Sequence, residues 1–181
     1  SKFLAFAYPV RTEEGIKMRI DELKKKYFDA THHCFAWVLG ADKGRFRAVD
    51  DGEPNHSAGD PILGQIRSRD LTNVLVVVVR YFGGTKLGVG GLIQAYKLAA
   101  EDALNHAILI EEDVTEKFLI RYPYDETSEV MRLVKEFDIK ILKQEYLEDC
   151  VLVTEIKLIN KDSLLTKLEL LQALSHKITF E

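Results

Sequence analysis

The fold of the first half of the chain is decided by one stretch, which reads Asn73-Val74-Leu75-Val76-Val77-Val78-Val79-Arg80-Tyr81 and continues as Phe82-Gly83-Gly84-Thr85-Lys86-Leu87-Gly88-Val89-Gly90-Gly91. The first part is almost uniformly apolar and rich in valine, a pattern typical of a strand covered on both faces. The second part is crowded with glycine and leads into residues 92–106, where apolar residues recur at helical spacing. The stretch therefore predicts a central strand, a glycine-rich loop and a helix that form the core of a first domain.

Shorter elements are predicted on the N-terminal side of this strand. Thr12, followed by two glutamates, is typical of a helix start, and the lysines at 24–26 favour the end of that helix through its dipole. The glycine-bounded residues 40–44 predict a hairpin turn, and Pro61 fits the first turn of a short helix. We expect a strand, a helix, a two-stranded hairpin and a short helix over residues 3–9, 12–26, 33–39 with 45–50, and 61–67.

A composition change after residue 110 marks the start of a second domain. The acidic run Glu111-Glu112-Asp113 is followed by alternating strand and helix patterns, with Asp125 and Asp162 as expected N-caps. The predicted order is strand, helix, strand, strand, helix, strand over residues 114–122, 125–137, 139–147, 150–159, 162–174 and 177–180. This order is the ferredoxin-like split pattern. We therefore predict an α+β fold with two domains, residues 1–110 and 111–181.

The composition is that of a folded globular protein, with 46% hydrophobic and 30% charged residues. The longest apolar run, residues 74–79, is far shorter than the roughly 18–20 residues that span a bilayer, so no membrane role is expected. Cys34 and Cys150 both lie within apolar patterns, which predicts buried thiols rather than a disulfide. We therefore expect a cytoplasmic protein.

The net charge of −4 is unevenly distributed along the chain. Residues 1–110 carry 15 Lys and Arg against 13 Asp and Glu, whereas residues 111–181 carry 10 against 16. Affinity for nucleic acid depends on the cations that meet phosphate. An RNA- or ribosome-facing role would therefore have to come from a local patch on the first half.

The glycine-rich loop is the first candidate for a binding site. Glycine amides can approach a ligand closely, a helix N-terminus adds partial positive charge, and Lys86 adds a mobile cation. This arrangement favours an anion, although the G-x-x-x-x-G-K-[ST] and G-x-G-x-x-G nucleotide motifs are both absent. An alternative interpretation is that the glycines only allow strand, loop and helix to pack in a tight crossover.

The polar residues 50–59 are the second candidate. Asp51, Glu53, His56 and Ser57 offer groups for acid–base work or metal binding. The residue types favour a structural interpretation, in which Asp and Ser side chains bind loop amides and cap the next helix. His32 and His33 should point to opposite sides of their strand, and no G-x-S-x-G motif supports a serine nucleophile. We predict no catalytic residue, resident metal or cofactor.

The two loops together resemble the IMPACT family, specifically its bacterial YigZ-like branch. The resemblance covers most of residues 3–110 and rests on Thr31-His32-His33-Cys34, Asp51-Gly52-Glu53-Pro54, Ala58-Gly59, Pro61-Ile62-Leu63, residues 73–88 and Gly90-Gly91-Leu92. The chain departs from the usual family pattern at Asn55-His56-Ser57, where Ser-Gly-Thr is commoner, and at Gln94, where Arg is commoner. The second half resembles the ferredoxin-like domain that bacterial members append.

The resemblance implies a first domain shaped like the second domain of a small-subunit ribosomal protein and domain IV of translocation factor G, and a second domain like domain V of that factor. Eukaryotic relatives act in translational control by binding a regulator of an initiation-factor kinase. The resulting hypothesis is a non-enzymatic protein of translation control that binds RNA, the ribosome or a protein partner. The predicted ligand-binding residues are Asp51, Glu53, Ser57, Arg80, Tyr81, Gly83, Gly84, Lys86 and Gly88, with His33 and His56 as additional candidates. The alternative is a hydrolase, with or without a metal, that uses Asp51, Glu53 and His33.

Overall fold

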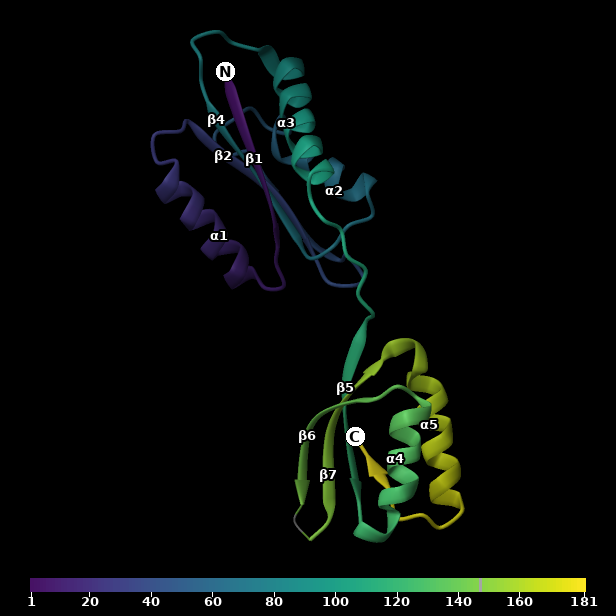
Figure 1. Ribbon diagram of the computed structural model, residues 1–181. Helices are drawn as coiled ribbons and strands as arrows, with labels where there is room; N and C mark the ends of the chain where they lie inside the picture. Colours follow the sequence, from purple (N-terminus) through teal and green to yellow (C-terminus); the bar gives the residue numbers. More distant parts are fainter. Residues whose placement is uncertain (147) are drawn as a thin grey trace. The chain divides into compact units, whose positions relative to one another are not determined.

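The computed structural model describes residues 1–146 and 148–181 and divides into two compact units, Ser1–Leu109 and Ile110–Glu181 (Figure 1). Each unit contains one four-stranded sheet in which every neighbouring pair of strands is antiparallel. The predicted α+β class is confirmed. Among the described residues, none of the helices combines the length and the apolar character needed to cross a membrane.

The first unit is built around the strand that the valine-rich stretch predicts. In chain order the elements are β1 (Lys2–Pro9), α1 (Glu13–Lys26), β2 (His32–Leu39), β3 (Arg45–Val49), α2 (Gly59–Ser68), β4 (Val74–Tyr81) and α3 (Gly88–Asn105). The strand order is β1-β4-β2-β3, so β4 pairs with β1 on one side and with β2 on the other. The prediction of a central strand is confirmed.

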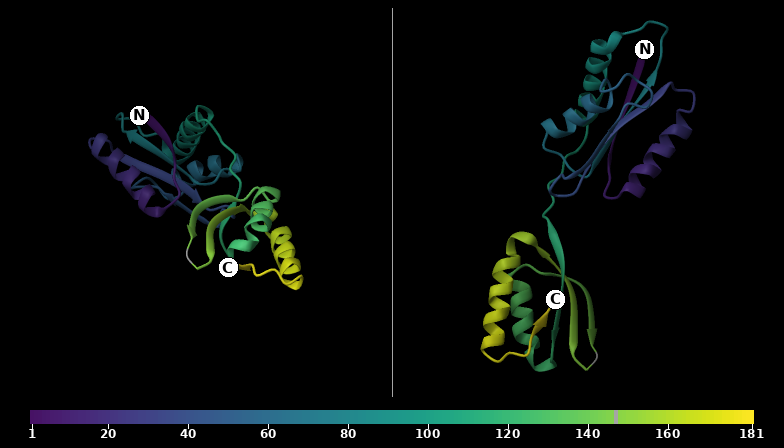
Figure 2. Two further views of the ribbon diagram at one scale, coloured as in Figure 1. Left: turned by 60° about the horizontal axis from the view of Figure 1, so that its bottom comes forward. Right: turned by 180° about the vertical axis from the view of Figure 1, so that it is seen from behind.

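The side chains of β4 alternate between two cores because successive residues of a strand point to opposite faces. Val76 and Val78 enter the core beneath α2 and α3. Leu75, Val77 and Val79 enter a separate core beneath α1. Figures 1 and 2 show α1 on one face of the sheet and α2 with α3 on the other. This double covering explains why the strand carries no polar residue before Arg80.

The helices of the first unit begin where capping chemistry allows. Thr12 caps α1, since its Oγ1 accepts a hydrogen bond from Gly15 N at 3.1 Å, as the sequence predicts. Helix α2 has Pro61 in its first turn. Helix α3 begins at Gly88, so the prediction of a start at residue 92 is wrong. Glycine has a low helix propensity, so the sequence gives no indication that Gly88, Gly90 and Gly91 belong to the helix.

The second unit has the predicted order of strands and helices. Its elements are β5 (Thr115–Tyr122), the short 3-10 helix η1 (Tyr124–Glu126), α4 (Thr127–Glu136), β6 (Lys140–Tyr146), β7 (Cys150–Lys157), α5 (Leu158–Ala173) and β8 (Thr179–Phe180). The strand order β6-β7-β5-β8 is that of a ferredoxin-like sheet. Residue 147, the last of one predicted strand, lies outside the described residues.

One face of this second sheet packs against α4 and α5 and forms a single core. Ile120 and Leu152 from the sheet meet Leu133 of α4 and Leu168 of α5 there. The predicted N-caps are wrong: Asp125 lies within η1, and Asp162 lies inside α5, which begins at Leu158. The backbone changes from strand to helix at the end of β7 without an intervening cap residue, so a capping side chain could not mark that boundary.

Candidate functional site

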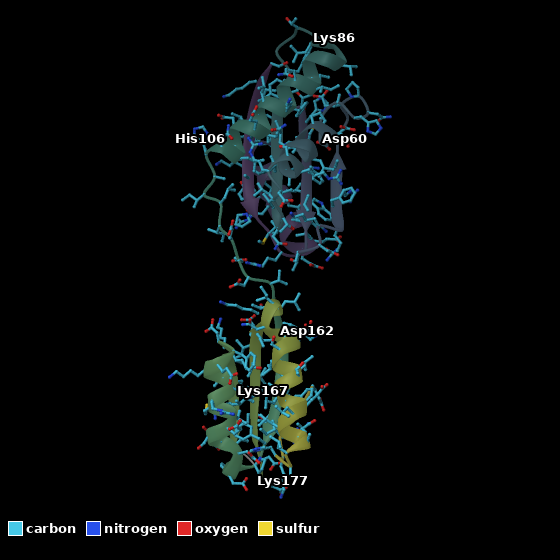
Figure 3. All side chains as sticks on the ribbon, turned by 90° about the vertical axis from the view of Figure 1, so that its right-hand side faces the viewer. Asp60, Lys86, His106, Asp162, Lys167 and Lys177 are labelled. Atoms are coloured by element: carbon cyan, nitrogen blue, oxygen red, sulfur yellow. The ribbon has the colours of Figure 1, made fainter. Side chains whose placement is uncertain are left out.

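The two candidate loops meet because of the strand order. Strands β3 and β4 are both antiparallel to β2, so they run in the same direction. The loops that follow them, residues 50–58 and 82–87, therefore leave from the same end of the sheet. Figure 3 shows Lys86 at the tip of this end, where α3 begins.

Glu53 joins the two loops through a buried ion pair. Its Oε1 lies 2.6 Å from Nη1 of Arg80, and the two residues are only 8% and 5% exposed. The hydroxyl of Tyr96, on α3, donates a second hydrogen bond to the same oxygen at 2.7 Å. His32 Nε2 lies 3.8 Å from this oxygen. The carboxylate thus ties the polar loop to β4 and to α3.

Arg80 is held on all sides by the protein itself. Its Nη2 donates to Ser1 Oγ at 3.1 Å, and its guanidinium carbon lies 5.7 Å and 5.6 Å from the ring centres of Phe3 and Phe82. Among the described residues, Nε alone of its nitrogens is buried without a hydrogen-bond partner. The positive charge of Arg80 is therefore paired inside the protein, and the side chain presents little surface to a ligand.

Cys34 and Tyr96 complete a buried polar network under the loops. The Cys34 thiol donates to the backbone oxygen of Asp50 at 2.9 Å and lies 3.3 Å from the Tyr96 hydroxyl. Burial, more than the neighbouring carboxylates, raises the pKa of Cys34 to about 12, while hydrogen bonding to Tyr96 opposes this. Burial and the hydrogen bond with Cys34 also raise the pKa of Tyr96. Both groups stay neutral near pH 7, so the thiol is a poor nucleophile.

Asp50 organises the polar loop from inside. One carboxylate oxygen accepts hydrogen bonds from Ala58 N at 3.0 Å and Gly59 N at 2.8 Å, and the other accepts from His56 N at 2.9 Å. Through these bonds Asp50 supplies the cap that α2 lacks from its own N-cap residue, Ala58. The structural interpretation of this loop is confirmed for Asp50.

Asp51 and Ser57 are also engaged by the backbone. Asp51 Oδ2 accepts from His33 N at 2.7 Å, and its Oδ1 lies 3.9 Å from Lys24 Nζ. Ser57 is fully buried and donates to Pro54 O at 2.6 Å. Asp51 has φ +43° and its neighbour Gly52 has φ +89°, which shows how tightly the chain turns here. These side chains shape the loop rather than point into an open cleft.

The two histidine candidates do not join Glu53. His33 Nε2 lies 3.1 Å from Tyr27 O, on the α1 face of the sheet, whereas Glu53 lies on the α3 face. The prediction that His32 and His33 point to opposite sides is confirmed. His56 is exposed and contacts Asp60. Asp51, Glu53 and His33 therefore do not form one catalytic cluster, and in residues 1–146 and 148–181 no group of His, Cys, Asp and Glu is arranged to hold a metal.

The glycine loop is the exposed part of this end. Gly84 and Gly88 have φ +85° and +71°, and a Cβ added at either would meet no atom within 4 Å. Leu87, at the N-cap of α3, has no side-chain capping bond, and the first turn contains no acidic residue. The amides at this helix start and the Lys86 ammonium thus face solvent, a combination that suits an anionic group.

The remaining loop candidates anchor its base. A Cβ at Gly83 would lie 2.5 Å from Ser1 N, so the glycine is required by a close backbone approach. Tyr81 donates to Asp29 Oδ1 at 2.8 Å, which raises the pKa of Tyr81 chiefly through that hydrogen bond. The predicted site residues therefore form two groups. Most make hydrogen bonds or close contacts within the protein, whereas Gly84, Lys86 and Gly88 form an exposed rim.

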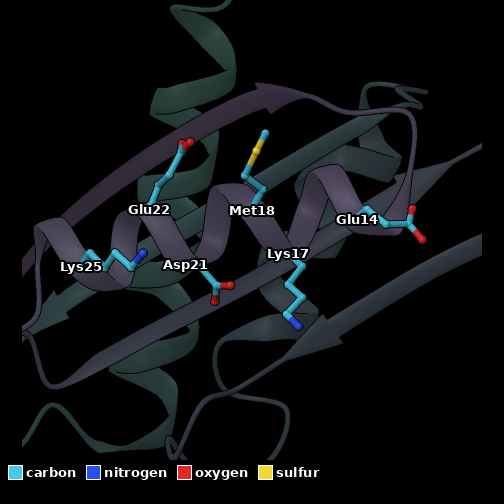
Figure 4. Close-up of a pocket in the computed structure, with 6 residues that line it drawn as sticks. All are labelled: Glu14, Lys17, Met18, Asp21, Glu22 and Lys25. Carbon is cyan, nitrogen blue, oxygen red and sulfur yellow. The ribbon is translucent and has the colours of Figure 1, made fainter.

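Two hollows of the surface lie away from the candidate loops. A hollow of about 480 Å³ follows the outward face of α1 and is lined by that helix alone, as Figure 4 shows, through Glu14, Lys17, Met18, Asp21, Glu22 and Lys25. A second hollow, of about 370 Å³, lies between β1 and the last turns of α3. Groups from several elements do not converge in the first hollow, and neither hollow includes the candidate residues.

Sequence reasoning missed the role of Tyr96. Tyr96 lies within residues 92–106, whose apolar spacing predicts a buried helix face, yet its hydroxyl donates a hydrogen bond to Glu53. A tyrosine rather than a phenylalanine at a buried position is a signal that a polar partner lies nearby. Cys34 and Asp50 gave no comparable signal, because their partners are backbone atoms or residues far along the chain.

The fold and this end define a two-unit α+β protein whose first unit carries a buried Glu–Arg pair beneath an exposed glycine loop. Residues 1–104 match the model of the Impact N-terminal domain family. The chain is 42% identical to the IMPACT family member YvyE of Bacillus subtilis over 111 residues, 61% of this chain and 51% of YvyE. It is 32% identical to the IMPACT family member YigZ of Escherichia coli over 148 residues, 81% of this chain and 72% of YigZ.

A crystal structure of an hypothetical protein superposes with a TM-score of 0.71 and 27% identity, covering 98% of this chain and 86% of the other. The chain therefore belongs to the IMPACT family, as its motifs predict.

Proposed function

We propose that the protein is a non-enzymatic binding protein of translation control, and that it binds through the glycine-loop end of its first unit. RNA, the ribosome and a protein partner are the classes of ligand that this proposal includes. Membership of the IMPACT family supports it, as does the absence of a converging set of catalytic groups among the described residues.

One observation carries the proposal. The groups that could perform chemistry, Asp51, Glu53 and Ser57, are consumed by internal hydrogen bonds, whereas Lys86 and the amides at the start of α3 are exposed. An enzyme needs reactive groups that a substrate can reach. A binding surface needs only exposed groups held in fixed positions, and the buried Glu53–Arg80 pair fixes the loops beside this rim.

Lysines from three parts of the chain lie near the same end of the sheet, where Lys24 lies 3.9 Å from Asp51 and Asp29 accepts a hydrogen bond from Tyr81. Lys2 pairs opposite Tyr81 at the end of β4, and the last turn of α1 leads directly to the start of β2 at this end. The lysines near this end that support the proposal are Lys2, Lys24, Lys25, Lys26 and Lys86. Such a cluster favours an acidic or phosphate-rich partner.

Co-sedimentation with ribosomal particles at a series of salt concentrations tests the proposal. We expect binding at low salt that weakens as salt rises, and Lys86→Ala should reduce the slope of log affinity against log salt by about one. Lys17→Ala, on the outward face of α1, is the matched control and should behave as the unaltered protein. Absence of binding at low salt for the unaltered protein would contradict the proposal.

A further inference from the structure

Helix α3 has an outward face whose composition is unusual for a solvated surface. Its inward residues Leu92, Tyr96, Ala100 and Leu104 are buried. The opposite side carries a set that we call the α3 seam, namely Leu87, Gly90, Gly91, Gln94 and Leu98. Leu87 and Leu98 are 40% and 51% exposed. The steps from 87 to 91, 94 and 98 are four, three and four residues, which keeps them on one side of a helix.

The outward face of α1 shows what a solvated helix looks like in this same unit. Of the six residues that line the hollow on that face, drawn in Figure 4, all but Met18 are charged. The α3 seam has no charged member, and charged residues return on α3 only from Lys97 onward. A stripe of this kind is typical of a helix that packs against another element.

The glycines of the seam support a close approach from outside. Glycine in a helix costs about 0.8–1 kcal/mol relative to alanine. Gly91 has an internal reason, since a Cβ there would lie 3.1 Å from the Leu87 Cβ. Gly90 has none, because a Cβ there would meet nothing within 4 Å. Because glycine has no side chain, Gly90 leaves a shallow depression between Leu87 and Leu98, where a side chain of a partner can enter.

The charged residues around the seam indicate which charge a partner should carry. From Phe82 to Ala100 the charged residues are Lys86 and Lys97, both exposed, and Glu101 and Asp102 follow one turn beyond Leu98, where Arg69 lies 3.9 Å from Glu101. The two lysines lie at the two ends of the seam, and the start of α3 adds the partial positive charge of a helix N-terminus. Carboxylates on a partner would complement all three. The seam contains no aromatic side chain on which a nucleobase could stack, which disfavours RNA at this face.

We propose that the α3 seam docks an amphipathic helix of a partner protein, with apolar side chains seated between Leu87 and Leu98 and acidic residues facing Lys86 and Lys97. Helix-on-helix packing explains the four-three-four spacing and the lowered middle of the seam. This inference rests on the proposed binding function and narrows the partner to an acidic, helical protein segment.

A photo-cross-linking amino acid placed at Leu98 in the full chain tests the inference in cells that make the protein. The control carries the same group at Met18, which is 53% exposed on α1. We expect cross-links from position 98 to a protein segment with apolar residues at helical spacing flanked by Asp or Glu. The double charge reversal Lys86→Glu with Lys97→Glu should reduce the yield at least tenfold. Cross-links to RNA, to a basic or neutral segment, equally from position 18, or to nothing, would overturn the inference.

A second measurement separates this inference from the proposed function. Leu98→Glu should retain the fluorescence spectrum of the buried Trp37, because the position is exposed, and should lose the seam's partner. If Leu98→Glu co-sediments with ribosomes as the unaltered protein does and also binds the cross-linked segment as tightly as the unaltered protein does, the seam inference is wrong and the proposed function stands. If position 98 cross-links to an acidic helix but the protein does not associate with ribosomes, the seam inference stands and the translation role is wrong.

Discussion

Glu53 is the residue on which the geometry of the functional end depends. It lies in a loop, yet its carboxylate is buried and accepts hydrogen bonds from β4 and from α3 at once. A buried ion pair adds little net stability over a well-packed apolar pair, but removal of one partner leaves an uncompensated charge in the interior. The pair is therefore best understood as a device that fixes where the two loops lie.

Replacing Glu53 with alanine should destabilise the first unit by about 3–5 kcal/mol, because Arg80 would remain buried without its counter-charge. Urea unfolding followed by fluorescence measures this, since the chain has a single tryptophan, Trp37, in the core beneath α1. Glu22→Ala, which removes the exposed Arg19–Glu22 pair, is the control and should cost less than about 0.5 kcal/mol.

A double variant, Glu53→Met with Arg80→Met, should be more stable than Glu53→Ala alone, because no buried charge is then left unpaired. A loss below about 1 kcal/mol for Glu53→Ala would mean that Arg80 finds water or another partner, and that the pair does not fix the loops.

His33 gives the first unit a pH dependence of known sign. Its burial lowers the pKa of the imidazole from 6.5, and the nearby Asp51 carboxylate opposes this effect. The unfolded chain then binds a proton at a higher pH than the folded chain does. The contribution to stability is therefore present above about pH 6.5 and is lost as the pH falls through the lowered folded pKa.

Urea midpoints by Trp37 fluorescence should accordingly fall between pH 7.5 and pH 5, and part of that fall should disappear in His33→Gln. The comparison with the unaltered protein isolates His33 from the other titrating groups. An identical pH profile for the two proteins would show that His33 carries the same pKa in the folded and unfolded chains.

At the scale of elements, periodic patterns of apolar residues predicted the strands and helices. Helix starts that are not marked by a capping side chain were not predicted correctly. The alternating burial of β4 follows from an unbroken apolar run, and α1 begins at Thr12 because a side-chain oxygen caps it. Helices α3 and α5 begin without a side-chain cap, at Gly88 and Leu158. Capping residues are the main start signal in a sequence, so both starts were placed four residues late.

Two glycines of the first unit should respond to alanine in opposite directions. Gly90→Ala should stabilise the unit by about 0.5–1 kcal/mol, because α3 gains helix propensity and the new methyl group meets no atom. Gly59→Ala should destabilise it by about 1–3 kcal/mol, because the Cβ would lie 2.5 Å from the backbone nitrogen of Val49.

Thermal or urea unfolding of the two variants beside the unaltered protein checks both signs. Binding to the seam's partner adds a further readout: Gly90→Ala should weaken binding while it strengthens the fold. A Gly90→Ala protein that is both more stable and equally tightly bound would mean that nothing approaches the seam closely.

At the scale of the whole molecule, the chain consists of two units that each bury their own apolar residues. Each sheet is complete within its unit. We therefore expect residues 1–109 and residues 110–181 to fold when produced separately. Far-ultraviolet circular dichroism of the two fragments should add up to the spectrum of the full chain, and each fragment should show its own cooperative thermal transition. An unfolded spectrum for either fragment would contradict this expectation.

The contacts within the candidate site could not be predicted from the sequence. The motifs placed Glu53 and Arg80 among the candidates from residue type alone, but the side-chain pattern does not state which strands are neighbours. The two residues meet because β3 and β4 both run antiparallel to β2, and that order is a property of the assembled sheet. The hydrogen-bond partners of Asp50 and Cys34 could not be predicted either, because they are backbone atoms whose positions depend on the path of the chain.

The position of β4 has a consequence for how the protein is made. Of the strands in the first unit β1 is synthesised first, yet among the described residues it pairs with β4 alone, and Lys2 lies opposite Tyr81, which is added later. Until then the β2–β3 hairpin can form locally, while the backbone N–H and C=O groups of β1 and β2 that pair with β4 stay without their partners. The nascent chain thus passes through a period of exposed strand edges that ends only when its central strand leaves the ribosome.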